Sequence, residues 1–324
     1  MLDPTDYGAF IALNGHMGVA SQDGGIPTFP VNFFNSPVYA VTTFRDALYP
    51  SSQMRKGIEM ANKAGGRVFY RERDGVHNFD YAEEELPLIA DFLNNHPRDP
   101  LPSKIIWESS DRRFGQCFWL AIDGVSEDQP TRWHKRYNAE IIDSSITIGF
   151  FPDDTFAGPG VLAGGIAGEE YLAGKMGLLP GDIIVGGNRI EIEKIGDINA
   201  FKSTIRYGDP VTIVVMRDDK KIELRDSLPE PRTTPLLKYA DNSSAIARAT
   251  FYGNIVEIES SRLRSFRILI NPDMFNIEQN LKVIVDGDIV YDKPIEPDPK
   301  FMLWNFWENL DRGLLYISEI EISL

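Results

Sequence analysis

Hydrophobic and polar positions near the beginning of the chain predict a strand, a helix and a second strand in that order. The run Val38–Val41 contains only aliphatic and aromatic side chains, which is typical of a strand buried on both faces of a parallel sheet. Met54, Ile58 and Ala61 then recur at spacings of four and three residues, so they share one stripe of a helix. Residues 67–72 alternate as a strand does. The pattern therefore predicts a strand–helix–strand unit with a parallel sheet.

Each of the two predicted strands is followed by a titratable residue. Asp46 lies in the turn after the first strand, and His77 lies in the loop after the second. The carboxyl ends of adjacent parallel strands are the usual position of a site in an open α/β sheet. A single Asp in a loop is most often a turn former, and a single His is most often structural. Together, at matching strand ends, the two residues predict a catalytic pair.

Residues 81–96 predict the helix that closes this unit. Leu86, Ile89 and Leu93 share one stripe of that helix. A proline-rich linker follows the helix. The unit is therefore expected to span residues 1–100.

The segments around Asp46 and His77 resemble two motifs of the α/β-hydrolase family. Residues 43–50 resemble the G-x-x-D-x-x-V-P that follows the family's seventh strand, and residues 74–77 resemble the G-x-x-H that follows its eighth. Residues 1–100 are thus similar to the C-terminal half of a serine esterase or peptidase, of the dienelactone-hydrolase or polyhydroxybutyrate-depolymerase type. The resemblance implies that Asp46 orients the imidazole and that His77 acts as general base and later as general acid.

The sequence departs from the hydrolase pattern at several positions. Thr43 replaces the Gly and Tyr49 replaces the Val of the first motif. No G-x-S-x-G, the family's nucleophile motif, occurs in the 324 residues, and the nearest approach, Gly15–Gly18, contains neither Ser nor Cys. We therefore expect the nucleophile-bearing half to lie outside this chain. Because the members of a triad act as a unit, we expect the chain on its own to be inactive.

A second family resemblance lies in the middle of the chain. Residues 176–188 resemble the G-L-x-P-G-D-x-I-x-x-x-N-G of a bacterial PDZ domain, although Gly187-Asn188 reverses the usual order of the last two residues. A predicted helix and two predicted strands follow, in the order of that family, and Asp219 replaces the usual glycine of the final hairpin. The resemblance implies a permuted PDZ domain over residues 144–230, with an α+β fold built on a partly open β-barrel.

A PDZ domain binds an extended peptide at a sheet edge, and its backbone N–H groups hold the peptide's terminal carboxylate. The loop that does this has a glycine between apolar residues, and residues 146–150 match it. Without the signature downstream, the same residues would read as a strand that contains a glycine. The residues assigned to the loop and groove are Thr147, Ile148, Gly149, Phe150, Phe201 and Ile205.

A third unit is predicted from two separated stretches, residues 101–140 and residues 240–324. The first stretch contains two predicted strands, 105–108 and 117–123, and the second reads as strand throughout. Asp286-Gly287 is a strong two-residue hairpin signal in the second stretch. We expect the two stretches to form one small, discontinuous β-sandwich-like domain into which the PDZ domain is inserted. The strand 117–123 would then pair with strands of the second stretch.

Composition limits the partners and cofactors of the chain. The net charge is −15, from 33 basic and 48 acidic residues, which argues against nucleic acid and anionic membrane surfaces as partners. No apolar run reaches the roughly 20 residues needed to span a bilayer. The single cysteine, Cys117, allows no internal disulfide, and the four histidines lack the spacing of metal ligands. We therefore expect no metal and no cofactor.

Three functions are compatible with these motifs. The first is a fragment of a serine hydrolase that transfers an acyl group from an ester or peptide substrate through a Ser-Asp-His triad. The second is a non-catalytic PDZ module that binds protein C-termini or extended peptides. The third is a pseudo-enzyme or assembly scaffold that uses its β domain as a contact surface. No signal peptide is visible in the sequence, and a periplasmic or secreted bacterial location stays open.

Overall fold

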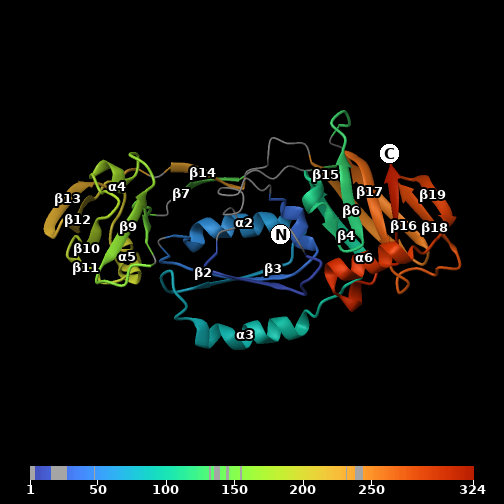
Figure 1. Ribbon diagram of the computed structural model, residues 1–324, viewed down its shortest axis with the longest axis horizontal. Coiled ribbons are helices and arrows are strands. Elements are labelled where there is room, and N and C mark those ends of the chain that lie inside the picture. Colours follow the sequence, from blue (N-terminus) through green and yellow to red (C-terminus); the bar gives the residue numbers. More distant parts are fainter. Residues whose placement is uncertain are drawn as a thin grey trace.

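The computed structural model describes residues 4–15, 28–46, 48–130, 133–134, 139–143, 146–153, 155–230, 232–237 and 244–324. Figure 1 shows three groups of elements along the long axis of the molecule, with an α/β unit in the middle. The unit built from residues 146–230 lies at one end of this axis, and a pair of β-sheets lies at the other. No helix within the described ranges is both long and apolar enough to cross a membrane.

A small parallel sheet forms the core of the N-terminal unit. Its strands are β1 (Phe10–Leu13), β2 (Val38–Thr43) and β3 (Val68–Arg73), which lie in the order β1-β2-β3. All six residues of β2 are buried, as its apolar run predicts. Helix α2 (Ser51–Lys63) covers one face of the sheet and α3 (Ala82–Asn95) covers the other (Figure 1). The protein is thus a mixed α/β protein with one small parallel sheet, but three strands do not make an α/β-hydrolase fold.

Helix α3 does not turn its leucines toward the sheet. Leu86 and Leu93 are 61% and 44% exposed, whereas Glu85 and Phe92 are buried together with Ile89. Of the stripe formed by Leu86, Ile89 and Leu93, only Ile89 is buried.

The carboxylate of Glu85 explains which face of α3 is buried. It accepts hydrogen bonds from Tyr39 Oη at 2.6 Å and from Arg71 Nε at 2.9 Å, and Arg73 pairs with the same carboxylate. Burial acts to raise the pKa of Glu85, but hydrogen bonds from these three side chains outweigh it and hold the pKa below its ordinary value. A buried carboxylate with such partners strongly favours one orientation, so it sets how α3 lies on the sheet.

Residues 146–230 form a unit with a core of its own. The elements are β8 (Phe150–Pro152), β9 (Val161–Ile166), α4 (Leu172–Lys175), β10 (Ile183–Gly187), β11 (Ile190–Glu191), α5 (Ile195–Lys202), β12 (Pro210–Arg217) and β13 (Lys220–Ser227). The strands lie in the order β13-β12-β10-β9-β8, and β11 pairs with β10. Asp218 and Asp219 have φ angles of +48° and +61°, which suit a type I′ hairpin turn. The Asp in place of glycine therefore still makes a tight turn.

Two further strands lie where the chain enters and leaves this unit. They are β7 (Ala139–Asp143) and β14 (Arg232–Leu237), and they pair antiparallel with each other. The entering and leaving segments thus run side by side (Figure 1).

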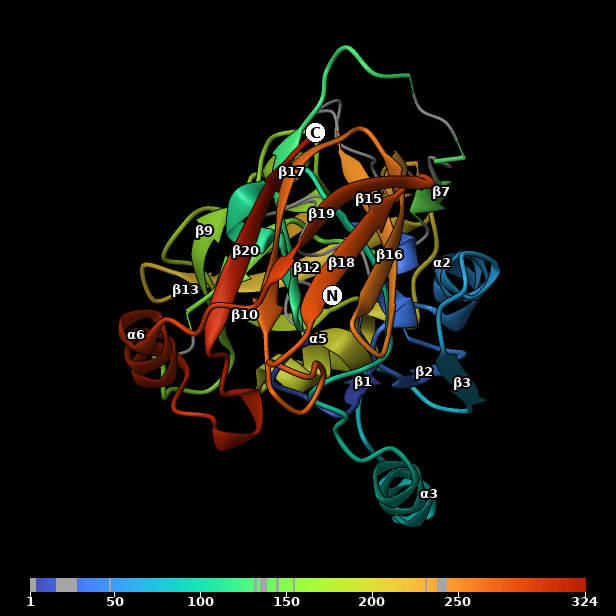
Figure 2. The same cartoon turned by 90° about the vertical axis from the view of Figure 1, so that its right-hand side faces the viewer.

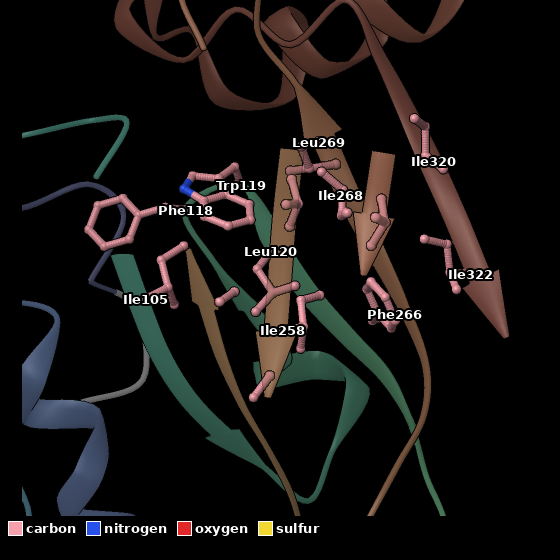
Figure 3. Packing of buried hydrophobic residues seen from close by; sticks show 14 of the residues in the cluster. Ile105, Phe118, Trp119, Leu120, Ile258, Phe266, Ile268, Leu269, Ile320 and Ile322 are labelled. Atoms are coloured by element: carbon pink, nitrogen blue, oxygen red, sulfur yellow. The ribbon is translucent and has the colours of Figure 1, made fainter. Parts of the chain in front are cut away.

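Two packed sheets make up the unit at the other end of the molecule. Their strands are β4 (Lys104–Ser109), β5 (Gln116–Cys117), β6 (Leu120–Val125), β15 (Ala245–Tyr252), β16 (Ile255–Ser261), β17 (Leu263–Ile270), β18 (Asn280–Val285), β19 (Asp288–Pro294) and β20 (Ser318–Ser323). One sheet has the order β19-β18-β16-β15-β4 and the other the order β20-β17-β6-β5. Figure 3 shows Ile105, Trp119 and Phe266 among the buried side chains of their common core.

Strands from both predicted stretches pair with one another in these sheets. Strand β4 pairs antiparallel with β15, and β6 pairs antiparallel with β17. Asp286-Gly287 connects β18 to β19 as a hairpin, as its sequence predicts. The division of the chain into domains stays a prediction, and these long-range pairings support it.

The second stretch is not strand throughout, because it contains a helix. Helix α6 (Pro299–Asn309) follows β19, and the short η3 (Arg312–Leu314) follows α6. The carboxylate of Asp298 accepts hydrogen bonds from the N–H groups of Lys300 and Phe301. An Asp N-cap followed by Pro is a helix start signal, and it is the local reason that the all-strand expectation is wrong here.

The side chains of Asn32 and Asn35 cover the outer edge of β4. Asn32 lies in η1 (Pro30–Phe34), and its amide accepts from the N–H and donates to the C=O of Glu108, both at 2.9 Å. Asn35 makes the same two bonds with Ile106, at 3.1 Å and 2.7 Å. The two amides thus replace a neighbouring strand, protect a sheet edge and fix the N-terminal unit to the β-sheets.

Replacing Asn32 by alanine is expected to lower the free energy of unfolding by about 2 kcal/mol or more, because it leaves two buried backbone groups of Glu108 without partners. Asn35→Ala should lower the free energy of unfolding by less, since Asn35 is only half-buried. Asn309→Ala, at an exposed position at the end of α6, serves as the control. Hydrogen exchange should show faster exchange of the Glu108 amide in Asn32→Ala, and unchanged exchange would contradict this account.

Candidate functional site

Asp46 and His77 lie side by side after the carboxyl ends of β2 and β3. His77 Nδ1 is 2.9 Å from Asp46 Oδ2. The carboxylate is fully buried, whereas the imidazole is 30% exposed. An ionised carboxylate only accepts hydrogen bonds, so the ring carries its proton on Nδ1 and keeps a lone pair on Nε2. The structure thus brings the two predicted residues together in the arrangement of an oriented base, and their catalytic role stays a prediction.

The backbone of its own turn holds the other oxygen of Asp46. Asp46 Oδ1 accepts hydrogen bonds from the N–H groups of Leu48 at 2.7 Å and Tyr49 at 2.8 Å. Burial acts to raise the pKa of Asp46, but the hydrogen bond to His77 and the two backbone N–H groups outweigh it, so the pKa lies below its ordinary value. The carboxylate is therefore fixed in place and ionised at neutral pH.

The two departures from the hydrolase motif both hold the His77 loop. Thr43 Oγ1 donates a hydrogen bond to the carbonyl of Val76 at 2.9 Å. The ring of Tyr49 meets the imidazole of His77 edge-on, with centroids 5.6 Å apart. A threonine and a tyrosine at these positions thus limit the movement of the imidazole. The departures from the motif at Thr43 and Tyr49 are the sequence signal for this role.

Contacts from other elements complete the support of this loop. The backbone N–H of Arg45 donates to the carbonyl of Gly75 at 2.9 Å, and Asn14, directly after β1, donates from its side chain to the carbonyl of Asn78 at 2.7 Å. Glu85 fixes the start of α3, which follows the loop. Sequence reasoning missed Asn14 and Glu85 because neither belongs to a motif and both act across long separations in the chain.

The buried Asp46 should make the protein sensitive to acid. Its folded pKa lies below the ordinary value of 3.8, so its stabilising contribution is fully present above about pH 4 and is lost as the pH falls through the folded pKa. Asp46→Asn removes this group, and the variant is expected to be less stable at neutral pH but to lose less stability on acidification. Unfolding measured from neutral pH to pH 2 would test this, and parallel pH profiles of the two proteins would contradict it.

The Nε2 side of the imidazole is open in the part of the chain that the structure describes. No described side chain makes a hydrogen bond to His77 Nε2. Strand β1 is an outer strand of the sheet, with β2 as its described partner. An apolar cavity of about 290 Å³ lies between β1, β2 and α2. Within the same ranges, no three His, Cys, Asp or Glu side chains are grouped to hold a metal ion.

Residues 147–150 lead into β8, the outer strand of its sheet. Gly149 has a φ angle of +90°, and a Cβ there would lie 2.1 Å from the Cβ of Tyr171. The carbonyls of Ile148 and Gly149 accept hydrogen bonds from the N–H groups of Ala173 at 2.8 Å and Ala167 at 3.0 Å. A trans peptide places its N–H opposite its C=O, so the N–H groups of Gly149 and Phe150 point away from these partners. The geometry suits an anion that approaches from outside.

The six residues assigned to the peptide loop and groove differ in how far they are exposed. Phe201 and Ile205 are 0% and 2% exposed and belong to the core of this unit, as does the buried Ile148. Phe150 is half-buried and packs against the same core, and Thr147 is exposed. A ligand beside β8 would thus meet backbone groups and Phe150 first. The role of all six residues in binding stays a prediction.

Comparisons with known proteins give a partial and distant likeness. No protein-family model and no curated protein matches the chain. Among solved structures, the HtrA-type protease AlgW with tripeptide is 23% identical over 27% of this chain and 31% of that chain, with a TM-score of 0.23. An AlgW variant with decapeptide is 22% identical over 26% of this chain and 29% of that chain, with a TM-score of 0.24. The chain thus spans less than a third of these two structures, and neither supports the α/β-hydrolase resemblance.

Proposed function

We propose that this chain is part of a serine hydrolase, an esterase or peptidase, whose nucleophile lies in a segment outside the 324 residues. The observation that carries the proposal is the 2.9 Å contact between His77 Nδ1 and Asp46 Oδ2, with the carboxylate buried and the imidazole partly exposed. Two backbone N–H groups hold the second carboxylate oxygen. This is the geometry of an acid that orients a general base.

The chemistry follows from the tautomer that Asp46 imposes. With the proton on Nδ1, Nε2 accepts the proton of a serine hydroxyl as its oxygen attacks the acyl carbon of the substrate. The imidazolium then gives this proton to the departing alcohol or amine. Water then attacks the acyl-serine ester and loses a proton to Nε2. The imidazolium returns this proton to the serine oxygen as its bond to the acyl carbon breaks, and the acid product leaves. Asp46 stabilises the imidazolium throughout, and no redox partner or metal is required.

Within the described residues, β1 has a paired strand on one side only, which supports a nucleophile supplied from outside. A parallel strand added along β1 would bring its carboxyl end to the same edge of the sheet as Asp46 and His77. The apolar cavity beside β1 and α2 would receive side chains of that segment.

The test is to express the chain together with the polypeptide that its reading frame encodes upstream, and to compare it with the 324-residue chain. We expect the longer protein alone to hydrolyse a chromogenic short-chain ester or a fluorogenic peptide, and to be labelled on serine by a fluorophosphonate. The preferred substrate then separates esterase from peptidase. Hydrolysis by neither protein would overturn the proposal, and activity of the shorter chain that depends on His77 would place the nucleophile inside it.

Peptide binding by residues 146–230 is the second candidate function, in which these residues act as a PDZ domain. The observation that favours it is the pair of N–H groups at Gly149 and Phe150, turned away from the unit beside the outer strand β8. Such N–H groups can hold a peptide carboxylate while the peptide extends along the strand. This candidate function does not require the nucleophile, and it is compatible with the hydrolase proposal in one protein.

A further inference from the structure

Helix α6 exposes several large apolar side chains on one face. Leu303, Trp304, Trp307 and Leu310 are 66%, 57%, 75% and 71% exposed. Positions 303 and 307 share one stripe of the helix, Trp304 lies next to it, and Leu310 follows directly after the last helical residue. We call these four residues the α6 face. Single exposed apolar residues are ordinary on a protein surface, but a contiguous group with two tryptophans indicates an interaction surface.

The segment after α6 is joined to the N-terminal unit. Asp311 forms an ion pair with Arg98, and Arg98 Nε donates a hydrogen bond to the carbonyl of Thr5 at 2.9 Å. The hydroxyl of Thr5 in turn accepts a hydrogen bond from the N–H of Phe118 at 3.0 Å. The interface between the β-sheets and the N-terminal unit therefore reaches the end of α6.

Exposed apolar side chains also lie between Thr5 and β1, the outer strand of the sheet in the described part of the chain. Tyr7, two residues after Thr5, is 55% exposed and contacts Phe10 with ring centroids 5.3 Å apart, and Ile11 of β1 is 38% exposed. Figure 2 shows β1 at the end of the sheet nearer α6, followed by β2 and β3. In this view, the edge of β1 that has no described partner faces the side of the sheet on which α6 lies.

We infer that the α6 face binds the nucleophile-bearing segment that completes the sheet at β1. This inference rests on the proposed function, and it names the second surface to which that segment binds. The α6 face continues the interface that the N-terminal unit makes with the β-sheets. Further strands added to the sheet beside β1 would therefore extend toward α6. The α6 face would then hold the segment in register with Asp46 and His77.

Hydroxyl-radical footprinting of the longer and shorter proteins tests the inference without any assay of hydrolysis. We expect oxidation of Trp304 and Trp307 to be at least five-fold slower in the longer protein than in the 324-residue chain. Tyr252, which is 49% exposed on β15, is the internal control and should react equally in both. Equal reactivity of the two tryptophans in both proteins would overturn the inference and leave the proposed function to its own assay.

A double variant distinguishes the proposed occupant from a second copy of the chain. In the longer protein, Trp304→Glu with Trp307→Glu should lower the melting temperature, whereas Ile289→Glu with Val290→Glu, at exposed positions on β19, should not. Self-association predicts two different results for the 324-residue chain. The tryptophans would become protected as its concentration rises, and sedimentation would show dimers that the double variant abolishes. These two results together would overturn the inference. If the longer protein protects the tryptophans but hydrolyses no substrate, the result counts against the catalytic proposal only.

Discussion

Replacing His77 by alanine is expected to reduce hydrolysis by the longer protein about 10⁴-fold, with little change in the Michaelis constant. The reason is that His77 Nε2 is the position from which the nucleophile's proton is taken, and general acid–base catalysis supplies about this factor. The imidazole is partly exposed, so its loss leaves no large core cavity. Steady-state kinetics with the preferred ester or peptide measure the effect.

Two further variants make this result specific. His96→Ala is the matched control, because His96 ends α3 and its ring contacts Phe92 and Phe69 rather than the site, and it should keep full activity. Asp46→Asn should lose activity nearly as far as His77→Ala. The asparagine would place its N–H₂ or its carbonyl against Nδ1, and neither can stabilise an imidazolium as a carboxylate does. An active His77→Ala protein would show that this pair is structural.

Replacing Gly149 by alanine is expected to weaken binding of peptides with a free C-terminus at least ten-fold. The φ angle of +90° already disfavours a side chain. In addition, the new Cβ would lie 2.1 Å from the Cβ of Tyr171, so the loop has to shift. The shift would misplace the N–H groups of Gly149 and Phe150. Anisotropy of a labelled peptide selected from a C-terminal library gives the affinity.

Gly181→Ala separates loop geometry from the general cost of a left-handed backbone. Gly181 has a φ angle of +95° in the same unit, but its added Cβ would have no heavy atom within 4 Å. It therefore shares the backbone strain of Gly149→Ala without the clash. We expect Gly181→Ala to bind the peptide as the unmodified chain does, and amidation of the peptide's C-terminus to weaken binding as far as Gly149→Ala does. If Gly149→Ala, Gly181→Ala and the unmodified chain bind the peptide equally, the loop is not part of the binding site.

Local signals in the sequence were sufficient for the central elements and for the candidate pair. The apolar run of β2 and the helical spacing in α2 depend only on neighbours along the chain, and both elements formed where they were expected. Asp46 and His77 could be paired because parallel strands bring their carboxyl ends to one edge. The hairpin at Asp286-Gly287 is local in the same sense.

Errors arose where distant residues decided the outcome or where a capping signal was overlooked. The apolar stripe of Leu86, Ile89 and Leu93 did not decide which face of α3 is buried, because the buried Glu85 and its partners from β2 and β3 turn another face to the sheet. Helix α6 was read as strand, although Asp298 and Pro299 are a local start signal. Phe201 and Ile205 are packed in the core, and their role in a peptide groove stays a prediction.

The sequence by itself therefore determined the parallel strand–helix–strand unit, the candidate acid and base, and the glycine of the candidate peptide loop. Each depends on periodicity, turn chemistry or spacing within a few tens of residues. Only the tertiary structure decided that Asn32 and Asn35 cover the edge of β4, that Glu85 orients α3, and that Trp304 and Trp307 of α6 are exposed. These depend on which side chains meet across long separations, and hydrogen-bond partners and burial are fixed only when the chain has folded.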